Sequence, residues 1–274
     1  MKWAPNHDAS IEKLWKVQSR LTVGLIMVPR QSFTTCKPTE TAKDVQQRNP
    51  DNFSFFPVEH EGRIIGLHNA ERWFNQAAPD TQIADDLQPL SEDILIAADA
   101  SILDFIMQAD RHPTNLVVSG SQIAGLISLS DIQQLPVRAA LFSAITSFEM
   151  AMALAITTRW PDPAEWIALL PEKRRRRLES EIANGREGDM AIDKISYTQF
   201  CDKKTLMVSS RALEIGRGKL EKALGRIERL RDPLAHANEY ADSSEKAKKV
   251  CETVRNLYDL KDEIMRYVNA AQNP

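Results

Sequence analysis

The sequence predicts an α+β protein of two domains: paired α/β repeats over residues 1–137, followed by an all-α helical bundle over residues 138–274. Three observations support this division. Short apolar runs alternate with short helical patterns in the first half. Two stretches of that half repeat each other at a nearly constant offset. After Pro136, both features give way to long segments with a 3.6-residue period.

Six short apolar runs in the first half are predicted as strands, and two helical patterns lie between them. The strands cover residues 23–28, 53–58, 63–67, 94–97, 116–118 and 123–128, and the helices cover residues 41–47 and 100–109. Alternation of strands with short helices indicates an α/β layer in which some strands are parallel.

An internal repeat is visible in the same half. Residues 39–45 align with residues 99–105 at an offset of 60, and residues 65–67 align with residues 124–126 at an offset of 59. A near-constant offset indicates two copies of one supersecondary unit. We expect the two copies to bury their faces against each other.

The second half is predicted as a bundle of about five helices. They cover residues 139–158, 163–183, 197–208, 209–230 and 243–271. Asp162 and Pro163 suit the N-cap and first position of a helix, and Glu165 suits its first turn. Asn184 and Gly185 are expected to end that helix.

The most apolar run, residues 139–156, contains the polar residues Ser143, Thr146, Ser147 and Glu149. A carboxylate in mid-span is costly in lipid, so we expect a buried core helix and no membrane contact. The first ten residues lack the apolar core of a secretory signal. The three cysteines lack metal-binding spacing and are expected to be free thiols. These observations together predict a cytoplasmic protein without a structural metal.

The net charge of −3 hides an asymmetry. Residues 1–137 carry 11 basic and 17 acidic residues, a net charge of −6, whereas residues 138–274 carry 24 and 21, a net charge of +3. Only the second half could therefore dock a polyanion such as RNA. The basic run at residues 173–177 forms a collar around a helix. It is either a solvated face with pairs such as Arg175–Glu179, or a contact for RNA phosphates.

A candidate ligand site closes the second repeat. Gly125 allows a close backbone approach, and Ser128 and Asp131 supply a hydroxyl and a carboxylate that can bind a ribose diol. Together with the repeat, these residues resemble the CBS (cystathionine β-synthase) domain over about residues 15–136. The resemblance implies an adenosine nucleotide as regulatory ligand. The first repeat has Asn69 and Arg72 at the equivalent positions, so at most one complete site is expected. The alternative is that Ser128 and Asp131 only cap a helix.

A candidate catalytic pair lies at the end of the helix predicted for residues 209–230. Arg231 can grip a phosphate with paired donors, and His236 can move protons near neutral pH. The pair suits phosphodiester chemistry without a metal. His236 would take the proton of a ribose 2′-OH or give one to the leaving oxygen, and Arg231 would hold the phosphate charge.

The phrase Leu-Arg-Asp-Pro-Leu-Ala-His at residues 230–236 resembles the motif of HEPN domains, helical bundles that include many ribonucleases. The resemblance covers about residues 139–271. It implies a role for Asp232 and for Glu149, which matches an acidic residue on the first helix. Pro233 departs from the pattern and is expected to kink the helix.

Each of these residues also has a structural alternative. Arg231 could cap the carboxyl end of its helix, and Asp232 could be the N-cap of a helix that begins at Pro233. His236 could be a buried, hydrogen-bonded histidine at a helix start. Many bundles of this kind are also catalytically silent.

The sequence thus favours a ligand-regulated, metal-independent endoribonuclease that needs no cofactor and leaves a cyclic phosphate. The alternative is a non-catalytic nucleotide sensor or scaffold whose helical domain dimerises or binds a partner. The helix at residues 139–158 is apolar on most sides, and one small bundle has few ways to enclose it. We therefore expect a homodimer in which Arg231 and His236 of both chains line a shared groove.

Overall fold

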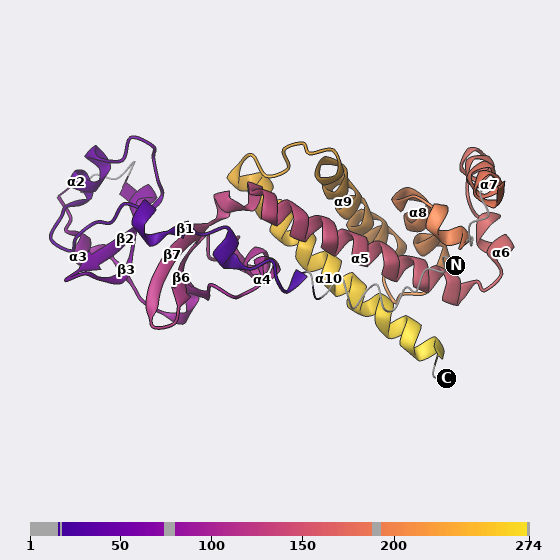
Figure 1. Ribbon diagram of the computed structural model, residues 1–274, viewed down its shortest axis with the longest axis horizontal. Coiled ribbons are helices and arrows are strands. Elements are labelled where there is room, and N and C mark those ends of the chain that lie inside the picture. The colour runs from indigo at the N-terminus through magenta and orange to yellow at the C-terminus, as the bar shows by residue number, and fades with distance from the viewer. Residues whose placement is uncertain (1–15, 17, 74–79, 188–192, 273–274) are drawn as a thin grey trace. The chain divides into compact units, whose positions relative to one another are not determined.

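The computed structural model describes residues 16, 18–73, 80–187 and 193–272. These residues form two compact units, an α/β unit over Thr22–Gln134 and a helical unit that begins at Leu135 (Figure 1). The described residues before Thr22 belong to the helical unit, where the side chain of Gln18 donates to Ser143 Oγ at 3.1 Å. This differs from the expected division, which placed them with the α/β repeats.

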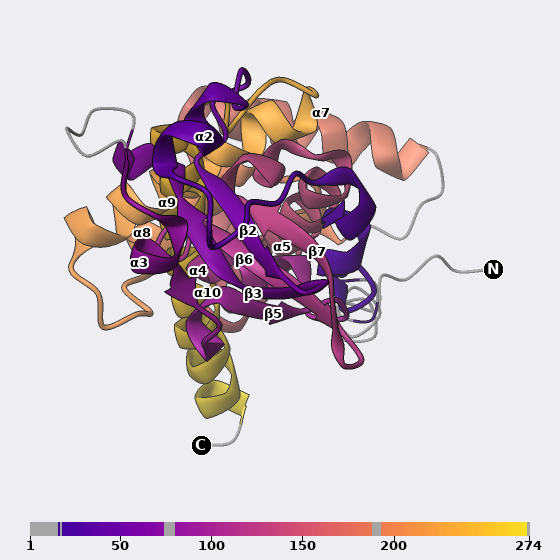
Figure 2. The same ribbon diagram turned by 90° about the vertical axis from the view of Figure 1, so that its left-hand side faces the viewer.

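The α/β unit contains two sheets (Figure 2). The four-stranded sheet has the order β1 (Val28–Pro29), β7 (Gln122–Ser128), β6 (Thr114–Ser119) and β5 (Leu95–Ala97). The three-stranded sheet has the order β2 (Phe55–His60), β3 (Arg63–Asn69) and β4 (Gln88–Pro89). Only β5 and β6 pair in parallel, and the other strand pairs are antiparallel. The mixed α/β layer predicted from the sequence is confirmed.

Short helices connect these strands. The α-helices are α2 (Ala42–Gln47), α3 (Ile83–Asp86) and α4 (Ile102–Gln108), and the 3-10 turns are η1 (Val23–Leu25), η2 (Arg30–Ser32), η3 (Ala70–Trp73), η4 (Glu92–Ile94) and η5 (Leu129–Gln133). Helix α2 begins at a reciprocal capping box, because Asp44 N donates to Thr41 Oγ1 and Thr41 N donates to Asp44 Oδ2. Helix α4 begins at Ser101, whose hydroxyl accepts from Leu103 N. The helix of each repeat therefore begins at a residue whose side-chain hydroxyl caps it.

The two repeats exchange their opening segments. Strand β1, from the start of the first repeat, pairs with β7 of the second repeat. Strand β4, from the start of the second repeat, pairs with β3 of the first repeat. Backbone hydrogen bonds follow the same exchange. Val23 N donates to Ala100 O, and the equivalent bond 60 residues away runs from Ile83 N to Glu40 O. In the same way, the bond from Gly24 N to Ala98 O matches the bond from Ala84 N to Pro38 O. Each repeat is therefore completed by the other.

Two glycines make this exchange sterically feasible. A Cβ atom at Gly66 in β3 would lie 2.2 Å from the carbonyl oxygen of Gln88 in β4. A Cβ atom at Gly125 in β7 would lie 2.7 Å from the carbonyl oxygen of Val28 in β1. The expected close approach at Gly125 therefore occurs, but the approaching backbone is a neighbouring strand. Gly125 therefore makes room for β1, and its role toward a ligand stays a prediction.

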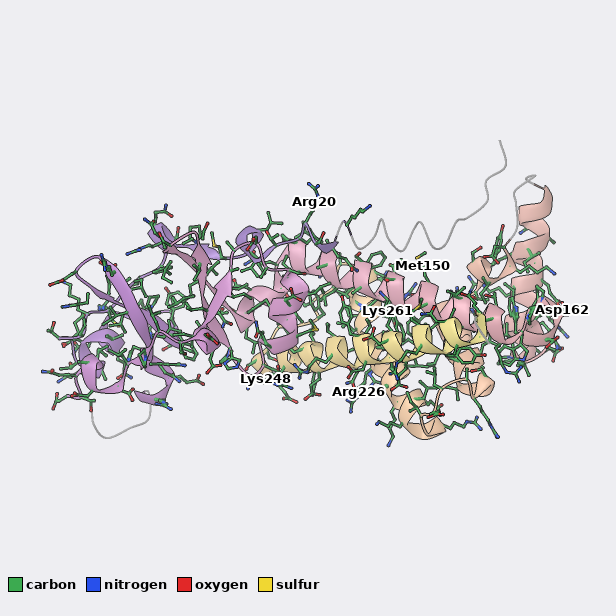
Figure 3. All side chains as sticks on the ribbon, turned by 90° about the horizontal axis from the view of Figure 1, so that it is seen from below. Arg20, Met150, Asp162, Arg226, Lys248 and Lys261 are labelled. Carbon is green, nitrogen blue, oxygen red and sulfur yellow. The ribbon has the colours of Figure 1, made fainter. Side chains whose placement is uncertain are left out.

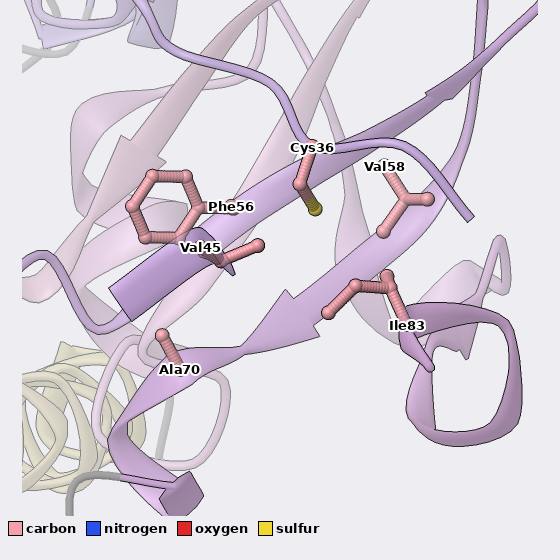
Figure 4. Close-up of a cluster of buried hydrophobic side chains, with 6 residues drawn as sticks. All are labelled: Cys36, Val45, Phe56, Val58, Ala70 and Ile83. Carbon is pink, nitrogen blue, oxygen red and sulfur yellow. The ribbon is translucent and has the colours of Figure 1, made fainter. Parts of the chain in front are cut away.

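The core of the α/β unit lies on both faces of its sheets. One cluster packs β2 and β3 against α2 and α3, and it consists of Cys36, Val45, Phe56, Val58, Ala70 and Ile83 (Figure 4). A second cluster joins Ile64 and Leu67 of β3 to Leu116 of β6. The two repeats bury their faces against each other, as expected from the internal repeat.

The helical unit contains α5 (Leu135–Arg159), α6 (Pro163–Ile167), α7 (Glu172–Glu187), η6 (Lys194–Tyr197), α8 (Phe200–Ser210), α9 (Arg217–Ala235) and α10 (Ser244–Gln272). Helices α5 and α10 run side by side, and α8 and α9 pack against α5 (Figure 1). Asp162 caps α6, as predicted, through a 2.9 Å bond from Ala164 N (Figure 3). This packing confirms an all-helical second half.

Helix α5 is buried mainly by the helices of its own chain. Its apolar residues Leu141, Ile145, Phe148, Met152 and Ile156 are at most 2% exposed, whereas Phe142 is 47% exposed. Within the described residues, α5 is the one helix long and apolar enough to span a membrane, and 61% of its most apolar window is buried. The expected core helix is confirmed. A single chain therefore covers most of α5 and leaves Phe142 exposed, and the homodimer stays a prediction.

Four local predictions were wrong. Residues 23–28 form the η1 turn and only then join β1, because the amides of Val23 and Gly24 bind the opposite repeat. The helix expected at residues 163–183 breaks before Pro171, and α7 then continues past Gly185. Residues 211–216 stand outside α9, which starts at Arg217. Helix α9 also continues through Pro233 to Ala235.

Candidate functional site

Ser128 and Asp131 form a reciprocal capping box where β7 meets η5. Ser128 donates to Asp131 Oδ2 from its backbone nitrogen at 2.7 Å and from its hydroxyl at 3.1 Å. Gln134 Nε2 donates to Asp131 Oδ1 at 2.8 Å and also to the carbonyl oxygen of Ile26 at 2.7 Å. The capping role that the sequence left open as an alternative is therefore present.

The same geometry leaves Asp131 with capacity for one more donor. A carboxylate oxygen accepts about two hydrogen bonds, and Oδ1 receives only the bond from Gln134 among the described contacts. Burial raises the pKa of Asp131, although the bonds from Ser128 and Gln134 oppose that shift. The Ser128 hydroxyl also lies 2.8 Å from the Ser130 hydroxyl. Two hydroxyls and a carboxylate therefore gather at one turn.

The equivalent position of the first repeat has different chemistry. Arg72 pairs with Asp86 at 3.5 Å, and the side-chain oxygen of Asn69 is buried without a partner. His68 is buried, its two ring nitrogens have no partner, and burial lowers its pKa. Ile127 stands at the matching place in the second repeat. Only the second repeat thus combines a hydroxyl with a carboxylate.

In the helical unit, Arg231 and Glu149 meet, although they are 82 residues apart in the sequence. Arg231 Nε donates to Glu149 Oε1 at 3.0 Å, and Lys203 Nζ lies 3.7 Å from Glu149 Oε2. Lys203 is buried and also donates to the carbonyl oxygen of Thr198 at 2.7 Å. Burial lowers the pKa of Lys203, and the charge of Glu149 opposes that shift. Glu149 is therefore the carboxylate that the two cations share.

Asp232 touches the edge of this cluster, 3.7 Å from Arg231, whereas no contact of His236 with it is seen among the described residues. His236 is exposed at the C-cap of α9, and Asp232 is exposed within the last turn. His236 comes five positions after Arg231, which corresponds to a rotation of about 140° around an ideal helix. The two residues therefore leave the helix axis on different sides. Neither an N-cap at Asp232 nor a buried His236 describes the structure.

Arg138 of α5 is a contact that sequence reasoning missed. It donates to the carbonyl oxygens of Pro233 and Asn238 at 2.8 and 2.6 Å, and its guanidinium lies 5.0 Å from the Tyr240 ring centre. Arg138 fixes the turn that carries His236. No sequence motif marks this role, because the partners are backbone oxygens about a hundred residues away.

The basic collar of α7 is largely paired. Arg174 binds Asp202 with two bonds of 2.8 and 2.6 Å, Arg177 binds Glu181 at 2.8 Å, and Arg176 pairs with Glu172. Arg175 and Glu179, which were expected to pair, form no ion pair in the described structure. They instead line an open cavity of about 440 Å³ between α6, α7 and η6. This collar fits a solvated face better than a phosphate contact.

The three cysteines are free, and Cys36 and Cys251 are buried. Burial raises the pKa of the Cys36 thiol to about 12, so the thiol is protonated at neutral pH. Among the described residues, no three His, Cys, Asp or Glu side chains gather in a group that could hold a metal ion. The candidate sites therefore consist of hydroxyl, carboxylate, guanidinium and imidazole groups.

No protein-family model and no curated protein matches this chain. Solved structures with a similar fold include a hemolysin-like protein containing a CBS domain from Oenococcus oeni PSU, with 18% identity over 44% of this chain and 94% of that one, at a TM-score of 0.37. The CBS domain of a bacterial CNNM/CorC family Mg2+ transporter, in complex with ATP, is 17% identical over 47% of this chain and 96% of that one, at a TM-score of 0.39. The CBS domains of a transcriptional regulator from Streptococcus pneumoniae are 19% identical over 40% of this chain and 95% of that one, at a TM-score of 0.35. These likenesses cover less than half of this chain and concern its fold alone.

Proposed function

We propose that this chain is a cytoplasmic nucleotide sensor, in which the α/β unit binds an adenosine nucleotide at Ser128 and Asp131. The observation that carries the proposal is the asymmetry between the repeats. The ends of β3 and β7 are equivalent positions, and only the second offers a hydroxyl next to a carboxylate with an unused acceptor position. A ribose diol would donate to Asp131 Oδ1, and Ser128 would supply the second polar contact.

Gln134 would couple the site to the rest of the chain. It binds both Asp131 and the backbone of Ile26, and it immediately precedes α5 in the sequence. A ribose hydroxyl that donates to Asp131 Oδ1 would share this oxygen with Gln134 and weaken its bond. The nucleotide would act by favouring one of two states of the Gln134 side chain.

Binding of ATP, ADP or AMP is expected to raise the melting temperature of the chain. A ligand at 100 times its Kd adds about 2.7 kcal/mol to the free energy of unfolding when it binds only the folded state. Asp131→Ala is expected to remove this shift, measured against the variant's own melting temperature and by calorimetry. Asp44→Ala is the matched control, because Asp44 closes the capping box of α2 in the same way. Equal ligand shifts in both variants would assign Asp131 to capping only.

A second candidate function is metal-independent cleavage of RNA by the helical unit, in a homodimer. The observation that favours it is that Arg231 is held by Glu149 while about a third of its side chain stays exposed, and that His236 is exposed at the next turn. His236 of one chain would take the 2′-OH proton, the 2′ oxygen would attack phosphorus, and the bond to the 5′ oxygen would break as that oxygen receives a proton from His236 of the second chain. Arg231 of the second chain would hold the phosphate charge, since the helix separates the two groups within one chain. Asp232 would orient Arg231, which it approaches to 3.7 Å.

Cleavage of single-stranded RNA is expected in excess chelator, with products that end in a cyclic phosphate. His236→Ala is expected to lower the rate by about 100-fold or more, the range for removal of a general base. His60→Ala, another exposed histidine, serves as the control. Absence of cleavage with and without adenosine nucleotides, or a monomer in light scattering, would contradict the candidate and leave the sensor proposal intact.

A further inference from the structure

Helix α9 carries a row of exposed cations with no partner. Lys219, Lys222, Arg226 and Arg229 are all exposed, and none of them forms an ion pair or hydrogen bond with another described side chain. Their spacing of three, four and three residues places them within an arc of about 80° on the helix, over a length of about 15 Å. We call these four residues the α9 stripe. Figure 3 labels Arg226, at the border of the helical unit.

The absence of partners distinguishes this stripe from other basic helices of the unit. On α7 and α10, cations such as Arg177 and Lys249 have carboxylates four residues away and bind them. On α9, the four stripe cations have no carboxylate four residues away, and each has another cation three or four residues away. The pairs Lys219–Lys222, Lys222–Arg226 and Arg226–Arg229 repel each other, which destabilises an isolated helix. A bound polyanion would remove this repulsion.

The surroundings of the stripe identify the kind of polyanion. A helix that lies on a membrane surface needs apolar side chains beside its cations. The apolar residues of α9 are instead buried in the core: Leu220, Leu224, Ile227, Leu230 and Leu234. Evenly spaced, flexible cations without an apolar anchor suit a phosphate backbone.

We propose that the α9 stripe binds the phosphate backbone of a nucleic acid. The row points along α9 toward His236, so a bound strand would pass the end of the helix. This inference rests on neither proposed function, because binding is measured without adenosine nucleotides and one of the two strands, oligothymidylate, has no 2′-OH group for the chain to activate. The shared chemistry is a single strand of phosphodiesters, either RNA or DNA.

The test measures fluorescence anisotropy of labelled 20-nucleotide oligothymidylate and oligouridylate, with the full chain, over a series of salt concentrations. The test variant is the double substitution Lys222→Gln and Arg226→Gln. The control is Arg176→Gln with Arg177→Gln, which removes the same charge from cations that are paired on α7. Both variants are first compared with the natural chain by circular dichroism.

The α9 variant is expected to weaken binding of both oligonucleotides by about 20-fold at 0.1 M salt, and to reduce the slope of log K against log salt by about 1.4. In the α7 control, we expect a smaller loss of affinity and a smaller change of the salt slope than in the α9 variant. An equal loss in both variants, or no binding at low salt, would overturn the proposal. Poly-glutamate provides the last comparison, since equally tight, stripe-dependent binding of that polymer would identify an acidic protein segment and overturn the assignment to nucleic acid.

Discussion

Gly66→Ala is expected to lower the free energy of unfolding of the α/β unit by about 3 kcal/mol, the upper end of the range for inserted atoms in a packed site. The added methyl would lie 2.2 Å from the carbonyl oxygen of Gln88, so β4 would have to leave the edge of β3. Hydrogen exchange is the measurement, because it reports the α/β unit separately from the helical one. We expect faster exchange for the amides of β3 and of Leu90, which bonds to Ile65.

Two comparisons make this test specific. Gly218→Ala is the matched control, since a methyl at that helical position meets no atom within 4 Å and alanine favours the helix. Gly125→Ala is expected to give a smaller effect, because Val28 O lies 2.7 Å away and the Met27 side chain can shift. Unchanged exchange in Gly66→Ala would show that β4 does not pack on β3 as described.

Glu149→Ala is expected to cost about 3–5 kcal/mol of stability, the range for removing one partner from a buried ion pair. The substitution leaves Lys203, which is 6% exposed, with the Thr198 carbonyl and the neighbouring charge of Asp202 but without its ion-pair partner. It also removes the closer of the two carboxylates beside Arg231. Urea unfolding followed by far-ultraviolet circular dichroism measures the loss.

A double-mutant cycle separates this structural role from a catalytic one. Lys203→Met fills a similar volume without a charge, so Glu149→Ala is expected to cost much less in that background. An equal cost in both backgrounds would contradict the buried pair. If the double variant regains stability but does not cleave RNA, Glu149 would also have a catalytic role. Glu149→Asp, which keeps the charge, tests whether reach alone matters.

The sequence was sufficient for the repeat, for the helix caps and for the change of fold class near Pro136. It could not predict the exchange of segments, because the offset between copies is the same whichever copy β1 and β4 complete. Residues 23–28 illustrate this limit. Their apolar pattern suits a strand, but the amides of Val23 and Gly24 bond to the opposite repeat and the chain turns there.

The candidate sites were predicted in part. Ser128 and Asp131 lie together, because residues three apart at a turn cannot separate far. Glu149 was singled out only through a family resemblance, and its ion pair with Arg231 was not predicted. Lys203 was missed because Lys203 and Lys204 look like a solvated pair in the sequence. Only tertiary packing buries the first of them, while the second reaches Glu228 at the surface.

The exchange of segments also sets the order in which the chain can fold as it leaves the ribosome. Strand β4 finds its partner β3 already synthesised, about 20 residues earlier. Strand β1 has to wait for β7, which follows about 100 residues later. At a synthesis rate of about 5–20 residues per second, Val28 and Pro29 stay without their partner for about 5–20 seconds. The three-stranded sheet can therefore close during synthesis, whereas the four-stranded sheet closes only when β7 has emerged.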